Sequence, residues 1–147
     1  MQLAQLNIGR AAAPLDSEQL RDFMENLDPI NALAEASPGF VWRLQTEDGN
    51  ATAIKAWDDP LMILNMSVWE SVESLADFVY RSAHTDFLRR RREFFEKPVE
   101  AIQVLWWVED GHRPTVAEAL ARLDHLRAHG PTEHAFTFRE ARDTCPG

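Results

Sequence analysis

Three residues form a set that could do chemistry: Asn7, Trp69 and His84. Asn7 lies near the end of a predicted first strand and Trp69 ends a later one, both on the more polar face of their strand. His84 follows on a helical segment. An imidazole has a reference pKa of about 6.5, so a histidine beside a buried indole could act as a general base toward a phenol or an enol. The structural alternative is a core tryptophan and a hydrogen-bonded histidine at a helix start.

Further polar residues on the same predicted surface could bind a ligand through hydrogen bonds. Amide, hydroxyl and guanidinium groups supply directed donors and acceptors, and those that could line the same cavity are Gln5, Asn65, Ser67 and Arg43. The alternative for these residues is a polar dimer interface or an internal hydrogen-bond network. Trp107 is assigned to the same pocket, although a core or interface anchor is the simpler explanation for it.

Arg91 follows His84 by seven positions, which is about two turns along one helical face. A guanidinium there could hold a carboxylate or an enolate of a ligand. The alternative is a solvated run, Arg89–Arg92, that pairs with Glu93 or Glu96. Nucleic-acid binding is not expected, because no aromatic or Gly-rich RNA motif accompanies the run and the formal net charge is −9.

Two other groups are weaker candidates for chemistry. His125 and His129 are spaced i, i+4 and could clamp a metal, but the sequence has no HExxH motif and a helix C-terminus favours histidines anyway. No metal site is therefore predicted. Cys145, the one cysteine, lies in a Pro/Gly tail away from any organised pocket, and the sequence contains no GxSxG, Walker or dinucleotide fingerprint.

Alternation of side-chain character predicts the strands that position these residues. Residues 2–9 and 62–69 each carry apolar side chains on one face and polar or aromatic ones on the other, so one face is predicted to be core and the other the wall of a pocket. A hairpin is predicted from strands at 40–45 and 52–57 around the turn at 47–50. Residues 101–108 are apolar on both faces, which predicts a strand buried on both sides, and 135–138 could be a last short strand.

Capping signals and apolar stripes predict the helices between these strands. The stripes run over 20–27, 29–33, 72–79, 87–95 and 116–123, and Gly130 is placed to end the last helix. The predicted N-terminal caps are Asp16 with Gln19, Asp28, Ser71, and Thr115 with Glu118.

The composition indicates one globular domain. A chain of 147 residues can bury roughly two thirds of its unfolded surface, and 45% hydrophobic residues exclude a disordered composition. The domain is predicted to span 1–138, followed by a loose tail at 139–147. Neither a signal peptide nor a membrane span is predicted, and a single cysteine fits a reducing cytosol, so a cytoplasmic location is expected. The preference for Arg over Lys suggests a GC-rich bacterium.

The predicted order β-α-β(β)-β-α-α-β-α-β indicates an α+β sandwich whose core, βαββαβ, is the ferredoxin-like arrangement, with an extra C-terminal helix. Its helices are predicted to cover the sheet face of Ala4, Leu6, Leu64, Met66 and Val68. The opposite face would then need a cover. A second sheet meeting it would give a homodimer with an enclosed cavity.

The segments QLAQLNIGR, NMSVWES, FVYRSAHTDFLRRRREFFE and WWV-x-x-GHRPT resemble an uncharacterised bacterial family of the dimeric alpha-beta barrel superfamily. Relatives implied by this resemblance are antibiotic-biosynthesis monooxygenases, haem-degrading monooxygenases, aldoxime dehydratases and muconolactone isomerases. Asn7, Trp69 and His84 resemble the Asn, Trp and His set of the haem-degrading enzymes, in which the histidine binds iron. Fifteen positions separate Trp69 from His84, a longer spacing than the resemblance to the haem-degrading enzymes implies.

Three functions follow as expectations. The first is a homodimeric enzyme of the antibiotic-biosynthesis-monooxygenase type, which needs no cofactor and oxygenates, isomerises or cyclises an aromatic or polyketide-like metabolite. In that function His84 is the base, and Asn7, Asn65 and Trp69 orient the ligand. The second is a haem-binding or haem-degrading protein with His84 as the iron ligand. The third is a non-catalytic dimeric module that binds a small hydrophobic or aromatic ligand, with no nucleic acid or membrane as partner.

Overall fold

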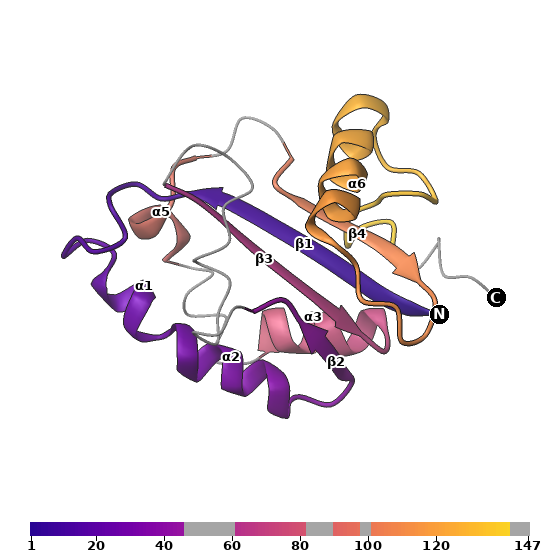
Figure 1. Ribbon diagram of the computed structural model, residues 1–147, viewed down its shortest axis with the longest axis horizontal. Coiled ribbons are helices and arrows are strands. Elements are labelled where there is room, and N and C mark those ends of the chain that lie inside the picture. Colours follow the sequence, from indigo (N-terminus) through magenta and orange to yellow (C-terminus); the bar gives the residue numbers. More distant parts are fainter. Residues whose placement is uncertain (46–60, 82–89, 98–100, 142–147) are drawn as a thin grey trace.

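The computed structural model describes residues 1–45, 61–81, 90–97 and 101–141, which form one sheet with helices on both sides (Figure 1). The strands are β1 (Gln2–Arg10), β2 (Phe40–Arg43), β3 (Met62–Trp69) and β4 (Gln103–Val108). Their order across the sheet is β2-β3-β1-β4, and every neighbouring pair is antiparallel. This is the ferredoxin-like order, so the predicted α+β class is confirmed.

The strands lie close to their predicted positions. β1 and β3 match the two alternating stretches, and β4 begins at Gln103, two residues later than predicted. The short strand predicted at 135–138 is instead a single bridge between Leu105 and Phe136. Hydrogen-bonded turns at 132–135 and 137–140 bend the chain on either side of that bridge and prevent a longer pairing. The return strand predicted at 52–57 lies outside the described residues.

The helices are α1 (Arg21–Glu25), α2 (Leu27–Ala36), α3 (Val72–Arg81), α5 (Arg91–Phe94) and α6 (Val116–His129). Two predicted caps are confirmed. Thr115 Oγ1 accepts a hydrogen bond from the Glu118 N–H at 3.1 Å, and Ser71 Oγ accepts one from the Ser74 N–H at 3.1 Å. Gly130 ends α6 with a φ of 75°, a backbone conformation that favours glycine.

The predicted capping box at Asp16 and Gln19 is wrong. α1 begins at Arg21 without a side-chain cap, and the Gln19 amide donates to the carbonyl oxygen of Glu93 at 3.0 Å. A bond to α5 has therefore taken the place of the cap. The predicted restart with Asp28 as cap is also wrong, since α2 already begins at Leu27 and Pro29 lies in its first turn, where no backbone N–H is needed.

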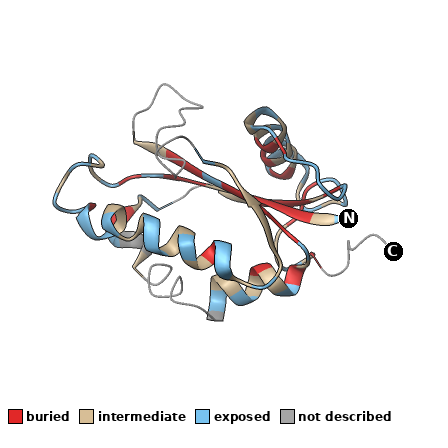
Figure 2. Cartoon of the chain, turned by 60° about the horizontal axis from the view of Figure 1, so that its bottom comes forward, coloured by how far each residue is buried: buried red, intermediate tan, exposed pale blue. Residues whose placement is uncertain are grey.

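The prediction that helices cover one sheet face is correct for α6, but the prediction that the opposite face needs a second sheet as its cover is wrong. The face of Ala4, Leu6, Leu64, Met66 and Val68 packs against α6 through Ala119, Leu123 and Leu126. The opposite face, with Leu3, Trp69 and Leu105, packs against Ala34 of α2 and Val72 and Leu75 of α3. Figure 2 shows the buried strands between α6 on one side and the remaining helices on the other. Large apolar side chains on both faces explain why each face is covered by helices of the same chain.

The chain stays packed through Ala141, which is fully buried with the α2 and α3 core. None of the helices in the described part of the chain has the length and apolarity needed to cross a bilayer.

Candidate functional site

A cavity of about 350 Å³ lies between the sheet and the helices α1, α2 and α3. This volume falls within the range of about 300–1,000 Å³ that is usual for small-molecule sites. Its floor is the sheet face of Trp69, which the polar alternation had indicated as a pocket wall. Its roof is largely apolar, with contributions from Phe23, Leu27, Ile30, Ala34, Leu75 and Phe78. The described walls of the cavity therefore come from one chain, without a second sheet.

The strand register places the polar side chains of the floor in two adjacent rows. In the first row, Gln5 of β1 lies opposite Ser67 of β3, which lies opposite Arg43 of β2. In the second row, Asn7 lies between its strand partners on β3 and β4. Directly opposed residues point to the same side of a sheet. The two rows form what is termed here the polar belt: Gln5, Asn7, Arg43, Asn65, Ser67 and Gln103.

Three hydrogen bonds fix the centre of the polar belt. The indole Nε1–H of Trp69 donates to Ser67 Oγ at 2.8 Å. The Gln5 amide donates to Ser67 Oγ at 2.8 Å and to Asn65 Oδ1 at 2.7 Å. Gln5 and Ser67 are buried, with 5% and 7% of their surface exposed. A buried network of this kind orders the side chains that take part in it.

The polar belt also retains unused hydrogen-bonding groups. Because Ser67 Oγ already accepts two hydrogen bonds, its own O–H remains a donor, and no acceptor for it occurs among the described residues. The side chain of Asn7 makes no hydrogen bond within the described part of the chain, and neither does the Oε1 atom of Gln5. Polar groups in protein interiors are normally paired. Unpaired groups that line a cavity are therefore suited to bind a ligand.

Aromatic side chains flank the polar belt on both sides along the direction of the strands. At one end Trp69 packs edge-on against Phe40, with ring centroids 5.5 Å apart, and stacks on Phe78 at 5.3 Å. At the other end Phe23 packs edge-on against Phe95 at 5.1 Å. Gly9 makes room for this second group, because a Cβ atom there would come within 2.8 Å of the Phe95 ring. A flat aromatic ligand would contact these rings while its polar substituents face the belt.

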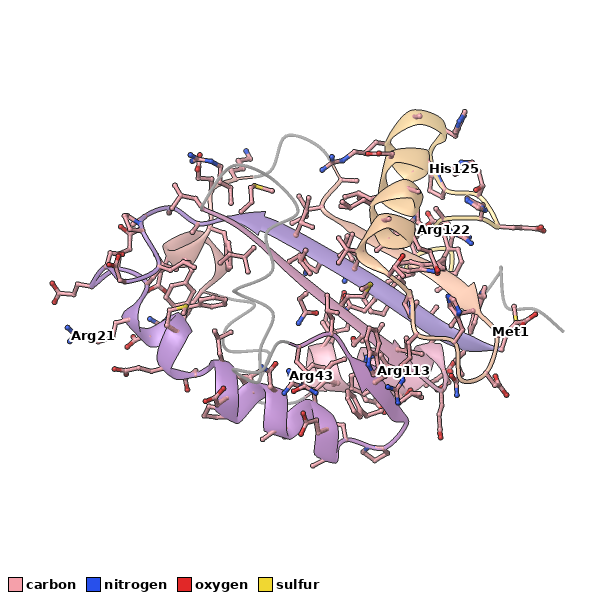
Figure 3. The ribbon with its side chains drawn as sticks, viewed as in Figure 1. Met1, Arg21, Arg43, Arg113, Arg122 and His125 are labelled. Atoms are coloured by element: carbon pink, nitrogen blue, oxygen red, sulfur yellow. The ribbon has the colours of Figure 1, made fainter. Side chains whose placement is uncertain are left out.

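Arg43 forms the β2 end of the polar belt. Its Nε–H donates to Glu35 Oε1 of α2 at 2.7 Å, and only 11% of the side chain is exposed. In Figure 3 Arg43 lies between the sheet and α2. Sequence analysis missed Glu35 and also Asn31, which lines the cavity one helical turn earlier. The available signal was the polar Asn31 within the apolar stripe of Leu27, Ile30 and Ala34.

The structure brings six of the predicted site residues to the cavity: Gln5, Asn7, Arg43, Asn65, Ser67 and Trp69. Trp107 shares a row with Leu3 but does not line the cavity, and its ring packs 6.2 Å from that of Phe136. His84 lies outside the described residues, as does the side chain of Arg91, whose backbone belongs to α5.

The described histidines lie away from the cavity, on or next to α6. The His125 ring, labelled in Figure 3, stands 4.6 Å from the rings of both His129 and His134. Burial, together with the positive charge of Arg122, lowers the pKa of His134. Across the described ranges, no group of three or more His, Cys, Asp and Glu side chains is arranged to hold a metal ion.

Two solved bacterial proteins share the fold of this chain. Rv0793 from Mycobacterium tuberculosis has a TM-score of 0.52 and 14% identity, with 77% of this chain and 100% of that chain covered. A candidate antibiotic biosynthesis monooxygenase from Nitrosomonas europaea has a TM-score of 0.50 and 13% identity, covering 75% and 92% of the two chains. At these identities the likeness shows a shared fold alone.

The chain belongs to DUF3291, a domain of unknown function, whose match spans residues 2–145. The uncharacterised family and the monooxygenase-like fold implied by the sequence resemblance are thus confirmed. No curated protein matches the chain.

Proposed function

We propose that this chain is an enzyme that binds an aromatic or polyketide-like metabolite in the cavity and oxygenates it without flavin or metal, isomerises it or cyclises it. The observation that carries the proposal is the polar belt, with unpaired hydrogen-bonding groups on the floor of a largely apolar cavity. A few directed polar groups within an apolar enclosure are typical of sites that orient a small molecule.

In this proposal His84 is the general base and Asn7, Asn65 and Trp69 orient the ligand. Removal of a proton from a phenol or an enol leaves an electron-rich anion, which can react with O₂ or rearrange. The Ser67 O–H and the amide donors of the belt would stabilise the oxygen on which that negative charge develops. The aromatic rings around Trp69 would hold the planar part of the substrate.

In the haem-binding alternative His84 is the iron ligand. Among the described lining residues Tyr80 is the one whose side chain belongs to a type that ligates haem iron. A non-catalytic binding module would use the same cavity without turnover. We give cofactor-free catalysis precedence because the polar belt offers groups that can stabilise a reacting oxyanion.

We also propose that the protein is a homodimer of the bacterial cytosol. The sheet surface that packs against α6 carries partly buried apolar side chains at its margin that do not line the cavity: Val41, Trp42 and Met62. A second copy of the chain would remove more of this surface from water, which favours association. In this arrangement each subunit keeps its own cavity.

Anthrone is a suitable first substrate, since loss of a proton gives an aromatic oxyanion and oxidation by O₂ gives anthraquinone and water. The wild-type protein is expected to raise anthraquinone formation and O₂ uptake above the spontaneous rate, and His84→Ala to return both to that rate. Arg113→Ala, an exposed change outside the cavity, serves as control. Saturable binding without turnover of anthrone or of hydroxylated relatives would identify a binding module instead.

A further inference from the structure

We propose that the natural ligand is an anion whose carboxylate binds to Arg43. This inference rests on the proposed function, because it assumes that an aromatic ligand occupies the cavity. It specifies that the substrate carries a negative charge, and it assigns one residue to the recognition of that charge.

Arg43 is the only charged residue among the described residues that line the cavity. No Asp or Glu side chain occurs in that lining, although the whole chain carries a formal charge of −9. A single cation in a largely apolar enclosure interacts strongly with an anion, since little water is present to screen the pair. The described lining therefore carries a cation and no anion, in a protein whose net charge is negative.

The hydrogen bonds of Arg43 leave most of its guanidinium available. The Nε–H donates to Glu35 Oε1, and the terminal amino groups donate to no described residue. None of the nitrogen atoms of Arg43 is both fully buried and unpaired, so the terminal groups remain accessible, and the residue itself lines the cavity. These groups match the two oxygens of a carboxylate.

Glu35 holds Arg43 in place without cancelling its effect inside the cavity. The Glu35 side chain is 46% exposed, whereas that of Arg43 is 11% exposed. Water therefore screens the carboxylate more than the guanidinium. A fixed guanidinium loses little side-chain entropy when a ligand binds.

The neighbouring donors suit the same anion. Ser67 lies opposite Arg43 across β2 and β3, and its O–H has no acceptor among the described residues. One carboxylate could accept hydrogen bonds from both side chains. The Phe40 ring lies on the same strand next to Trp69, so an aromatic acid could place its ring on these side chains and its carboxylate on Arg43.

The test compares two probes of equal size, 2-naphthoate and the neutral 2-naphthamide, by isothermal titration calorimetry at low ionic strength. Wild-type protein is expected to bind 2-naphthoate at least about tenfold more tightly than 2-naphthamide, which corresponds to about 1.4 kcal/mol. Arg43→Gln is expected to abolish this preference and to leave the affinity for 2-naphthamide within about twofold. Arg113→Gln, an exposed change outside the cavity, should retain the wild-type preference.

The outcomes separate this inference from the proposed function. Equal binding of the two probes by the wild-type protein would overturn the anion site and leave the aromatic cavity standing. A preference for 2-naphthoate that persists in a folded Arg43→Gln protein would overturn the assignment of Arg43. Binding of neither probe would contradict the aromatic cavity and the anion site together. The wild-type comparison tests the preference for an anion even if Arg43→Gln fails to fold.

Discussion

Ser67 and Asn7 belong to the same polar belt but differ in what they do for the folded chain. Ser67 Oγ is the acceptor for two buried donors, the Trp69 indole and the Gln5 amide. Asn7 makes no side-chain hydrogen bond with any described residue. Loss of a residue that supports the network should lower the free energy of unfolding, whereas loss of a residue with unpaired groups should lower the affinity for a ligand.

Ser67→Ala is expected to lower the free energy of unfolding by about 2–6 kcal/mol, because it leaves two buried donors unpaired at about 1–3 kcal/mol each. Asn7→Leu, of similar size, should change it by less than about 0.5 kcal/mol or raise it, since no hydrogen bond is lost. Urea denaturation followed by circular dichroism measures both values. Equal losses in the two variants would contradict the division of roles.

Six cavity residues could be predicted from the sequence, because alternation along the strands places them together on one face, where polar side chains are unusual. It did not identify Asn31 and Glu35, because polar residues on a helix usually face solvent and their direction depends on how the helix packs. It assigned Trp107 to the pocket, but this residue does not line the cavity, because an indole suits a pocket or a core equally well.

At the scale of elements, Glu118 fastens α6 to the sheet. Its carboxylate accepts a hydrogen bond from Trp106 Nε1 of β4 at 3.0 Å and lies 2.8 Å from His112 Nε2. Burial acts to raise the pKa of Glu118, but the hydrogen bonds from His112 and Trp106 outweigh it and the pKa is lowered. The ionised carboxylate is therefore the form that holds the helix.

Glu118→Gln is expected to lower the free energy of unfolding by about 1–2 kcal/mol at pH 7, since charge-assisted hydrogen bonds become neutral ones. A folded-state pKa below the unfolded value gives stability that is complete above the ordinary value of 4.5 and is lost as the pH falls through the folded pKa. The difference between the two proteins should thus shrink below about pH 4.5. Denaturation curves from pH 7 to pH 3 measure it, and a constant difference would contradict this role.

At the scale of the whole molecule, alternation along β1 and β3 was enough to predict a ferredoxin-like sheet with two unlike faces. It did not predict that helices of the same chain cover both faces, although each face carries large apolar residues: Leu6 and Met66 on one, Leu3 and Trp69 on the other. The face against which each helix packs depends on the handedness of connections and on packing between distant segments. Because α2 and α3 pack on the face of Trp69, the described walls of the cavity come from one chain.

Light scattering coupled to size exclusion is expected to give twice the mass of the 147-residue chain at micromolar concentration. In the proposed homodimer, partly buried apolar residues such as Trp42 and Met62 would provide the surface for association. A monomeric mass that persists at high protein concentration would refute the homodimer. The cavity would be unaffected, since its described walls come from one subunit.

The most direct test of the cavity as a site for oxygenated aromatic compounds is a calorimetric titration of wild-type and Asn7→Leu protein with 1,8-dihydroxyanthraquinone. This compound is planar, carries several oxygen atoms and resembles the product of an oxygenation. We expect saturable binding with one ligand per subunit, and binding about fivefold to tenfold weaker in an equally stable Asn7→Leu protein, the effect of losing one hydrogen bond. No saturable binding, or the same affinity in both proteins, would contradict the assignment of this cavity and its polar belt.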